Sequence, residues 1–162
     1  EPAGRSNGLC FDKDGKLWAC ADGKNELWKI DPATKDKTVV VKGHAGKLLN
    51  GPNDLWVTPA GGVYFTDPFY KRKYWDRGPE EQDKRGVYFL SPGGKLSRVD
   101  DDYKQPNGVV GTPDGQTLYV ADIGKGKTYA YDIRPDGTLA NRRTFCDKGS
   151  DGMTLDEEGN VY

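Results

Sequence analysis

The sequence predicts an all-β protein with the repeats of a β-propeller, and this chain of 162 residues supplies about three and a half blades of it. The first observation is a sequence motif that occurs four times. It begins with an Asn or Asp, called the lead residue, which is followed by an apolar stretch and, eight positions after the lead, by a turn glycine. The lead residues are Asn7, Asn53, Asn107 and Asp151, and the turn glycines are Gly15, Gly61, Gly115 and Gly159. The second observation is the period, since the leads lie 46 (7 to 53), 54 (53 to 107) and 44 (107 to 151) positions apart. Repeats of about 40–50 residues filled with short strands are typical of propellers, with one four-stranded blade per repeat.

Each repeat begins with a predicted hairpin. Alternating residues flank an Asp-Gly or Gly-Gly turn, which is the strongest short-range signal for a hairpin. The hairpins are predicted at 9–12 with 16–21, 55–58 with 63–66, and 109–112 with 117–121. The outer strands are predicted at 26–30 with 38–42, 86–90 with 95–99, and 128–133 with 138–145. No segment has sustained helical periodicity, so an all-β fold is predicted throughout.

The lead residues divide the chain into repeats at approximately 7–52, 53–106, 107–150 and 151–162, of which the last is incomplete. Closed propellers need about 4–8 blades. The chain does not begin with Met, and it stops within a predicted strand. We therefore expect a partial propeller domain over 1–162 with further blades on both sides, and an isolated fragment that is inactive. A three-bladed protein is the alternative, but its sheets would keep open edges.

Composition limits the possible partners. A formal net charge of -1 argues against an electrostatic grip on nucleic acid, and no apolar stretch approaches the length of a membrane span. We expect a soluble protein, with the compartment (cytoplasm, periplasm or exterior) and the oligomeric state left open. Three cysteines are too few for a disulfide scaffold. A two-residue turn at Asp14-Gly15 would place Cys10 opposite Ala19 and Cys20 on the other face, so we expect no bridge between the two cysteines.

The lead positions are where the sequence predicts chemistry. The first strand of each blade lines the central channel of a propeller, so residues at the starts of these strands converge at the channel mouth. Ca²⁺ prefers six to eight oxygen ligands, including carboxylates and amide carbonyls. We therefore predict a cation site at Asn53, Asn107 and Asp151, completed by a further carboxylate and by waters. The alternative is that Asn or Asp before Gly only caps a loop, because these residues tolerate turn geometry.

Two other features have both a functional and a structural interpretation. His44 is the only histidine, and we interpret it as a loop residue, with contact to a substrate as the alternative. The segment 70–85, called the insertion below, accounts for the longest spacing and carries balanced charges with Tyr70, Tyr74 and Trp75 interleaved. It is either a solvated loop or a lid over the channel mouth.

Four segments of the chain carry a family resemblance. They are Leu49-Asn50-Gly51-Pro52-Asn53-Asp54-Leu55, Val63-Tyr64-Phe65-Thr66-Asp67-Pro68, Gln105-Pro106-Asn107-Gly108 and Ser150-Asp151-Gly152-Met153. In this order they resemble the gluconolactonase and senescence marker protein family and, more distantly, propellers of the diisopropyl fluorophosphatase and paraoxonase types. The resemblance implies a six-bladed propeller with lactonase activity and a divalent metal at its centre. Ca²⁺ is the expected ion, and Zn²⁺, Mg²⁺ and Mn²⁺ are the alternatives.

The resemblance also assigns roles to individual residues. It implies that Asn107 and Asp151 are metal ligands, that Asn53 is a ligand or a substrate contact, and that a metal-binding Glu lies in a preceding blade outside this chain. Asp67 matches a position that binds a second calcium in some relatives, although an Asp before proline is often only a turn residue. Gly51 stands where some animal-type members carry an Arg that holds substrate, so their sugar-lactone specificity does not carry over.

The expected reaction is hydrolysis of a small lactone or ester, with the carbonyl polarised by the cation during attack by water. Asp151 is expected to act as ligand and as either general base or nucleophile, and Asn53 to orient the carbonyl or the water. Asn7, Asn50 and His44 are further candidates for substrate contact. Two alternatives remain, a non-enzymatic propeller that binds proteins or peptides and a metal-free synthase of the strictosidine-synthase type. Neither alternative would need matched Asn and Asp leads.

Overall fold

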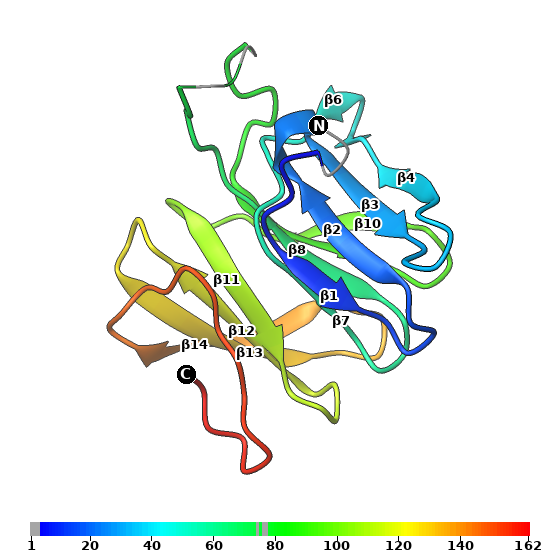
Figure 1. Cartoon of the computed structure of the whole chain (residues 1–162). Helices are drawn as coiled ribbons and strands as arrows, with labels where there is room; N and C mark the ends of the chain where they lie inside the picture. The colour runs from blue at the N-terminus through cyan, green and yellow to red at the C-terminus, as the bar shows by residue number, and fades with distance from the viewer. Residues whose placement is uncertain (1–3, 74, 76–77) are drawn as a thin grey trace.

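The computed structural model describes residues 4–73, 75 and 78–162, and within them it confirms the all-β prediction. The first sheet contains β1 (Leu9–Phe11), β2 (Leu17–Ala21), β3 (Glu26–Ile30) and β4 (Lys37–Val41) in that order. The second contains β7 (Leu55–Val57), β8 (Val63–Asp67), β9 (Gly86–Leu90) and β10 (Leu96–Asp100). The third contains β11 (Pro106–Gly111), β12 (Thr117–Asp122), β13 (Lys127–Ile133) and β14 (Leu139–Cys146). Each sheet is antiparallel and follows chain order, and the sheets lie next to one another (Figure 1), as consecutive propeller blades do.

Two short elements were not predicted. A 3₁₀ turn, η1 (Asp22–Lys24), joins β2 to β3, and a small hairpin of β5 (Gly43–His44) and β6 (Lys47–Leu48) follows the first sheet. The hairpin closes through Ala45 and Gly46, whose φ values of +52° and +77° suit a two-residue turn. His44 therefore lies in a strand, and its interpretation as a loop residue was wrong.

The four turn glycines share one geometry. Gly15, Gly61, Gly115 and Gly159 have φ values of +73°, +86°, +74° and +86°, which a residue with a side chain rarely adopts. Each donates its N–H to the carbonyl three residues earlier, at 2.8–3.2 Å. The fourth repeat has only the bridge Leu155–Val161 beyond this turn.

The first hairpin corrects the predicted register. Asp12 N donates to Lys16 O at 2.9 Å, so the loop has three residues instead of two. Cys10 consequently pairs with Trp18, not with Ala19, and it packs against the same core cluster as Cys20. Both cysteines are free.

The core lies between the sheets. Because side chains alternate along a strand, β8 contributes Phe65 to the cluster shared with the first sheet and Tyr64 to the cluster shared with the third. Both side chains are fully buried, as is the rest of β8. The second sheet is thus covered on both faces, and aromatic side chains of its strands pack between blades.

The innermost strands lie close together at one end of the sheets. β7 contacts both β1 and β11, and Gly8 N donates to Asn53 O at 2.6 Å. A Cβ on Gly8 would lie 2.6 Å from the Cα of Asp54, so only glycine fits there. Gly8 and Gly108 do not have the positive φ of a turn glycine, so the backbone conformation does not require glycine at either position. Glycine follows these leads because neighbouring blades approach closely.

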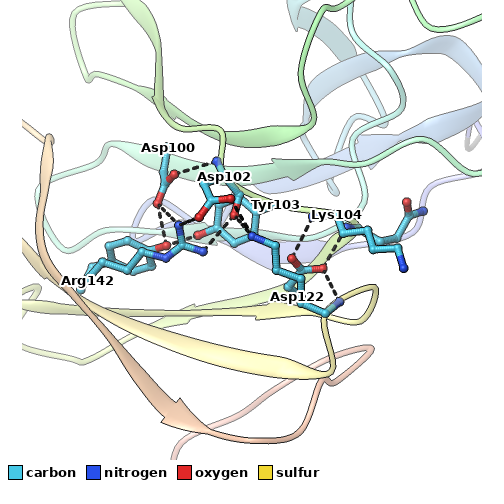
Figure 2. A network of polar contacts seen from close by, with 9 residues as sticks. Asp100, Asp102, Tyr103, Lys104, Asp122 and Arg142 are labelled. Carbon is cyan, nitrogen blue, oxygen red and sulfur yellow. Dashed lines mark hydrogen bonds and ion pairs between the residues drawn. The ribbon is translucent and has the colours of Figure 1, made fainter.

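A polar network fixes the connection that enters the third sheet (Figure 2). Arg142 on β14 pairs with Asp102 at 2.8 Å, and its guanidinium lies 3.9 Å from the ring centroid of Tyr129. At the other end of the connection, the carboxylate of Asp122 accepts the N–H groups of Lys104 and Gln105 at 2.9 and 2.8 Å. These contacts determine where the chain arrives at Asn107.

Among residues 4–73, 75 and 78–162, no helix is long and apolar enough to cross a membrane.

Candidate functional site

The structure brings the four lead residues to one place. A pocket of about 380 Å³, called the lead pocket below, is lined by Asn7, Gly8, Leu9, Asn53, Asp54, Asp151 and Gly152. Asn107 adjoins it, because its Nδ2 donates to Asp151 Oδ1 at 2.9 Å. Asn53, Asn107 and Asp151, which are 54 (53 to 107) and 44 (107 to 151) positions apart in the chain, therefore meet around one pocket.

Asn107 has the most informative side chain of the site. It is 1% exposed, and its Nδ2 donates to Asp151 Oδ1 and, at 2.6 Å, to the hydroxyl of Tyr70. Its Oδ1 is buried and has no hydrogen-bond partner among the described residues. A buried oxygen left in this way costs about 1–3 kcal/mol. A 180° rotation of the Asn107 side-chain amide does not remove this cost, because Oδ1 would then face the carboxylate of Asp151.

Local structure explains why Asn107 stands there. The register of β11 and β12 shifts between Pro106 and Val109, so Asn107 lies in a bulged part of the strand. Strand β11 begins at Pro106, three residues earlier than predicted, and therefore includes the lead residue. Bulges change the direction of a side chain, and this one lies next to the pocket.

Thr66 and Asp54, of which Asp54 lines the lead pocket, connect the second sheet to the third. Thr66 Oγ1 donates to Asn107 O at 2.7 Å and accepts from Asp54 N at 3.1 Å. The carboxylate of Asp54 accepts from Val109 N at 2.9 Å and from Leu55 N at 3.0 Å. Sequence reasoning gave neither residue a role, although an acidic residue in place of the glycine that follows the other leads was a visible signal at position 54.

Asp54 also has a shifted pKa. Burial raises the pKa of this carboxyl to about 6, with a further increase from the charge of Asp151, while its hydrogen bonds to Val109 and Leu55 act in the opposite direction. A cation bound beside this carboxyl would favour its ionised form and lower its pKa.

Asn53 and Asn7 reach the pocket from neighbouring blades. Asn53 is 3% exposed, and its backbone is fixed by N–H donation to Thr66 O at 2.9 Å. Asn7 is exposed, and its N–H donates to Cys20 O at 3.0 Å. Both side chains end in an amide, so each offers one oxygen acceptor.

Asp67 lies outside the lead pocket. Its two carboxylate oxygens accept the N–H groups of Asn50 and Gly51 at 2.9 and 2.8 Å. Asp122 holds Lys104 and Gln105 in the same way one repeat later, so this aspartate supports the segment leading into a lead residue. Its role in binding a second calcium stays a prediction.

Asn50 and His44 lie under the insertion and do not line the lead pocket. Asn50 Oδ1 accepts from Gln82 N at 3.3 Å, and the Nε2 of Gln82 donates to His44 O at 3.0 Å. The His44 ring packs edge-on against Tyr88 with centroids 5.3 Å apart. Contact of either residue with a substrate stays a prediction. Tyr74 of the insertion lies outside the described residues.

The oxygen chemistry of the lead pocket fits a hard cation. Amide and carboxylate oxygens are ligands that suit Ca²⁺ or Mg²⁺ better than soft metals. In the described part of the chain, no three His, Cys, Asp or Glu side chains are grouped closely enough to hold a metal ion. A cation here would therefore depend on Asn107 Oδ1, a buried acceptor next to the lead pocket that has no hydrogen-bond partner in the described part of the chain.

Comparison with known proteins gives consistent matches. A gluconolactonase of Zymomonas mobilis is 34% identical over 180 residues, covering 99% of this chain and 51% of that protein. The structure of a gluconolactonase from Xanthomonas campestris superposes with a TM-score of 0.87 at 35% identity, covering 96% of this chain and 54% of that one. A calcium-binding protein, regucalcin from Agrobacterium tumefaciens, shares the fold at a TM-score of 0.62 and 20% identity, covering 96% of this chain and 65% of that one.

These matches cover nearly all of this chain but only part of each relative. The chain spans about half the length of the curated relatives it matches, 51% and 42% for the first two. The family model described as SMP-30/Gluconolactonase/LRE-like region matches residues 1–162, which is the whole of this chain. The chain therefore belongs to the SMP-30/gluconolactonase/LRE-like family.

Proposed function

We propose that the full-length protein is a lactonase, a carboxylic ester hydrolase that opens small lactones at the lead pocket with the help of a bound divalent cation, Ca²⁺ in the first instance. The observation that carries the cation site is the buried Oδ1 of Asn107, which has no partner among the described residues while Asp151 holds the amide in place. The lactonase activity is supported by the similarity to gluconolactonases.

Asn53, Asn107 and Asp151 are the residues that would hold the ion. When bound, a hard cation supplies polarisation of a carbonyl and stabilises negative charge on its oxygen. Asn53 positions the carbonyl or the attacking water from the neighbouring blade. Asp151 acts as general base or as nucleophile. As a base it takes a proton from the water that adds to the carbonyl carbon, the ring C–O bond breaks, and the proton passes to the departing ring oxygen.

The wider assembly belongs to the same proposal. The complete propeller has six blades, and a carboxylate ligand from another blade completes the site. The isolated chain is then inactive, because it lacks that ligand. Counting the blades in a crystal structure of the full-length protein tests the first statement, and assaying the separate chain for lactone hydrolysis tests the second.

The experiment is a calcium titration of the full-length protein by calorimetry, followed by hydrolysis assays on aldonolactones and simple aryl esters. Asp151→Ala should abolish both Ca²⁺ binding and turnover. Asp147→Ala is the matched control, since Asp147 is an exposed aspartate that pairs with Lys127 on the surface, at 2.7 Å. Normal turnover in Asp151→Ala would refute the assignment, and a wild-type protein that binds no Ca²⁺ would favour a metal-free or non-enzymatic propeller.

A further inference from the structure

The insertion touches the candidate site directly. It follows β8 and extends beyond the end of the sheets at which β11 begins (Figure 1). Its first residue, Tyr70, places its hydroxyl 2.6 Å from the Nδ2 of Asn107. An insertion that was only solvated would not need to contribute a side chain to the interior end of the third blade.

The rest of the insertion is attached to the segment just before Asn107. Gln105 Nε2 donates to the carbonyl of Phe69 at 3.0 Å, on the entering side of the insertion. Gln105 Oε1 accepts from Arg85 Nη1 at 2.7 Å, on the leaving side. Arg85 is itself held by a two-bond ion pair with Glu80, at 2.6 and 3.0 Å. One glutamine therefore joins both ends of the insertion to the strand that carries the lead residue.

The hydroxyl of Tyr70 completes the hydrogen bonding of the Asn107 amide. The two protons of Nδ2 are taken by Asp151 Oδ1 and by the Tyr70 oxygen. With both donors used, the amide group has one orientation, in which Oδ1 is the atom without a partner among the described residues. A preorganised acceptor binds a cation more tightly than one that must first turn toward it.

We propose that Tyr70 is a positioning residue, which holds the Asn107 amide with Oδ1 presented as a ligand and thereby couples cation binding to the order of the insertion. This inference rests on the proposed cation site. Coupling of this kind is reciprocal: if the insertion contact strengthens cation binding, then a bound cation stabilises the insertion by the same factor.

The test uses Tyr70→Phe in the full-length protein, which removes one oxygen and keeps the ring. Loss of one neutral hydrogen bond corresponds to Ca²⁺ affinity that is weaker by about 3–10-fold, measured by calorimetry. Tyr119→Phe is the matched control, because the Tyr119 ring packs on Phe145 at 4.8 Å, away from the lead pocket. Unchanged Ca²⁺ affinity in Tyr70→Phe would overturn the proposal.

Limited trypsin digestion gives a second readout that does not depend on activity. The insertion offers Lys71, Arg72 and Lys73 as cleavage sites, and the cleavage rate reports how often it detaches. Ca²⁺ should slow this cleavage several-fold in the wild type and less in Tyr70→Phe, with Gln105→Ala changing in the same direction. If the wild type binds no Ca²⁺, the proposed function fails, yet Tyr70→Phe must still speed cleavage without added ion. An unchanged rate there would refute the positioning role itself.

Discussion

Thr66→Val would remove a hydroxyl that connects two blades behind the lead pocket. Thr66 is fully buried, and its Oγ1 donates to Asn107 O at 2.7 Å and accepts from Asp54 N at 3.1 Å. Valine has nearly the same shape, so packing is preserved while a carbonyl and an N–H lose this partner. Each such loss costs about 1–3 kcal/mol. With two such losses, we expect the free energy of unfolding to fall by about 2–6 kcal/mol.

The assay is urea denaturation of the full-length protein, comparing midpoints at constant m-value. Thr38→Val is the matched control, since Thr38 is exposed on β4 and the same change there should stay within about 0.5 kcal/mol. Thr66→Ser keeps the hydroxyl and should recover part of the loss. If the free energy of unfolding of Thr66→Val lies within about 0.5 kcal/mol of the wild-type value, the hydroxyl is not a significant connection between the blades.

Two further predictions concern the sheets. Burial alone would raise the pKa of Asp12, but the ion pair with Lys29 at 2.8 Å and the hydrogen bonds from Lys16 N and the Trp18 indole N–H hold this pKa well below its usual range. A lowered folded-state pKa gives stability that is present above the unfolded value of about 3.9 and is lost as pH falls toward the folded value. Asp12→Asn should therefore lower the urea midpoint at pH 7 and differ progressively less below about pH 4; a constant difference would contradict this. Arg142→Ala removes the stacking on Tyr129 and the pairing with Asp102 (Figure 2), and should cost about 1–2 kcal/mol by thermal unfolding, with Arg142→Lys only partly restoring it. Full recovery in the lysine variant would show that charge alone matters.

Several features of the fold were predictable because they depend on neighbouring residues. Turn glycines eight positions after each lead defined the inner hairpins, since positive φ at a fixed place requires glycine. Most strand boundaries agreed with the sequence to within a residue. Two differences have local causes. A three-residue loop shifted the cross-strand pairing of Cys10, and a bulge moved the start of β11 so that this strand includes Asn107.

The all-β class, the repeat and the convergence of Asn7, Asn53, Asn107 and Asp151 could be predicted from the sequence alone, because a turn glycine eight positions after each lead marks equivalent positions in successive blades. The surroundings of these leads depend on contacts between blades. The hydroxyl of Tyr70, 37 positions from Asn107, and that of Thr66, 41 positions away, reach this lead through contacts between blades. A hydrogen bond between residues so far apart leaves no periodic trace in the chain, since it depends on how the blades pack and on where a long insertion returns to them.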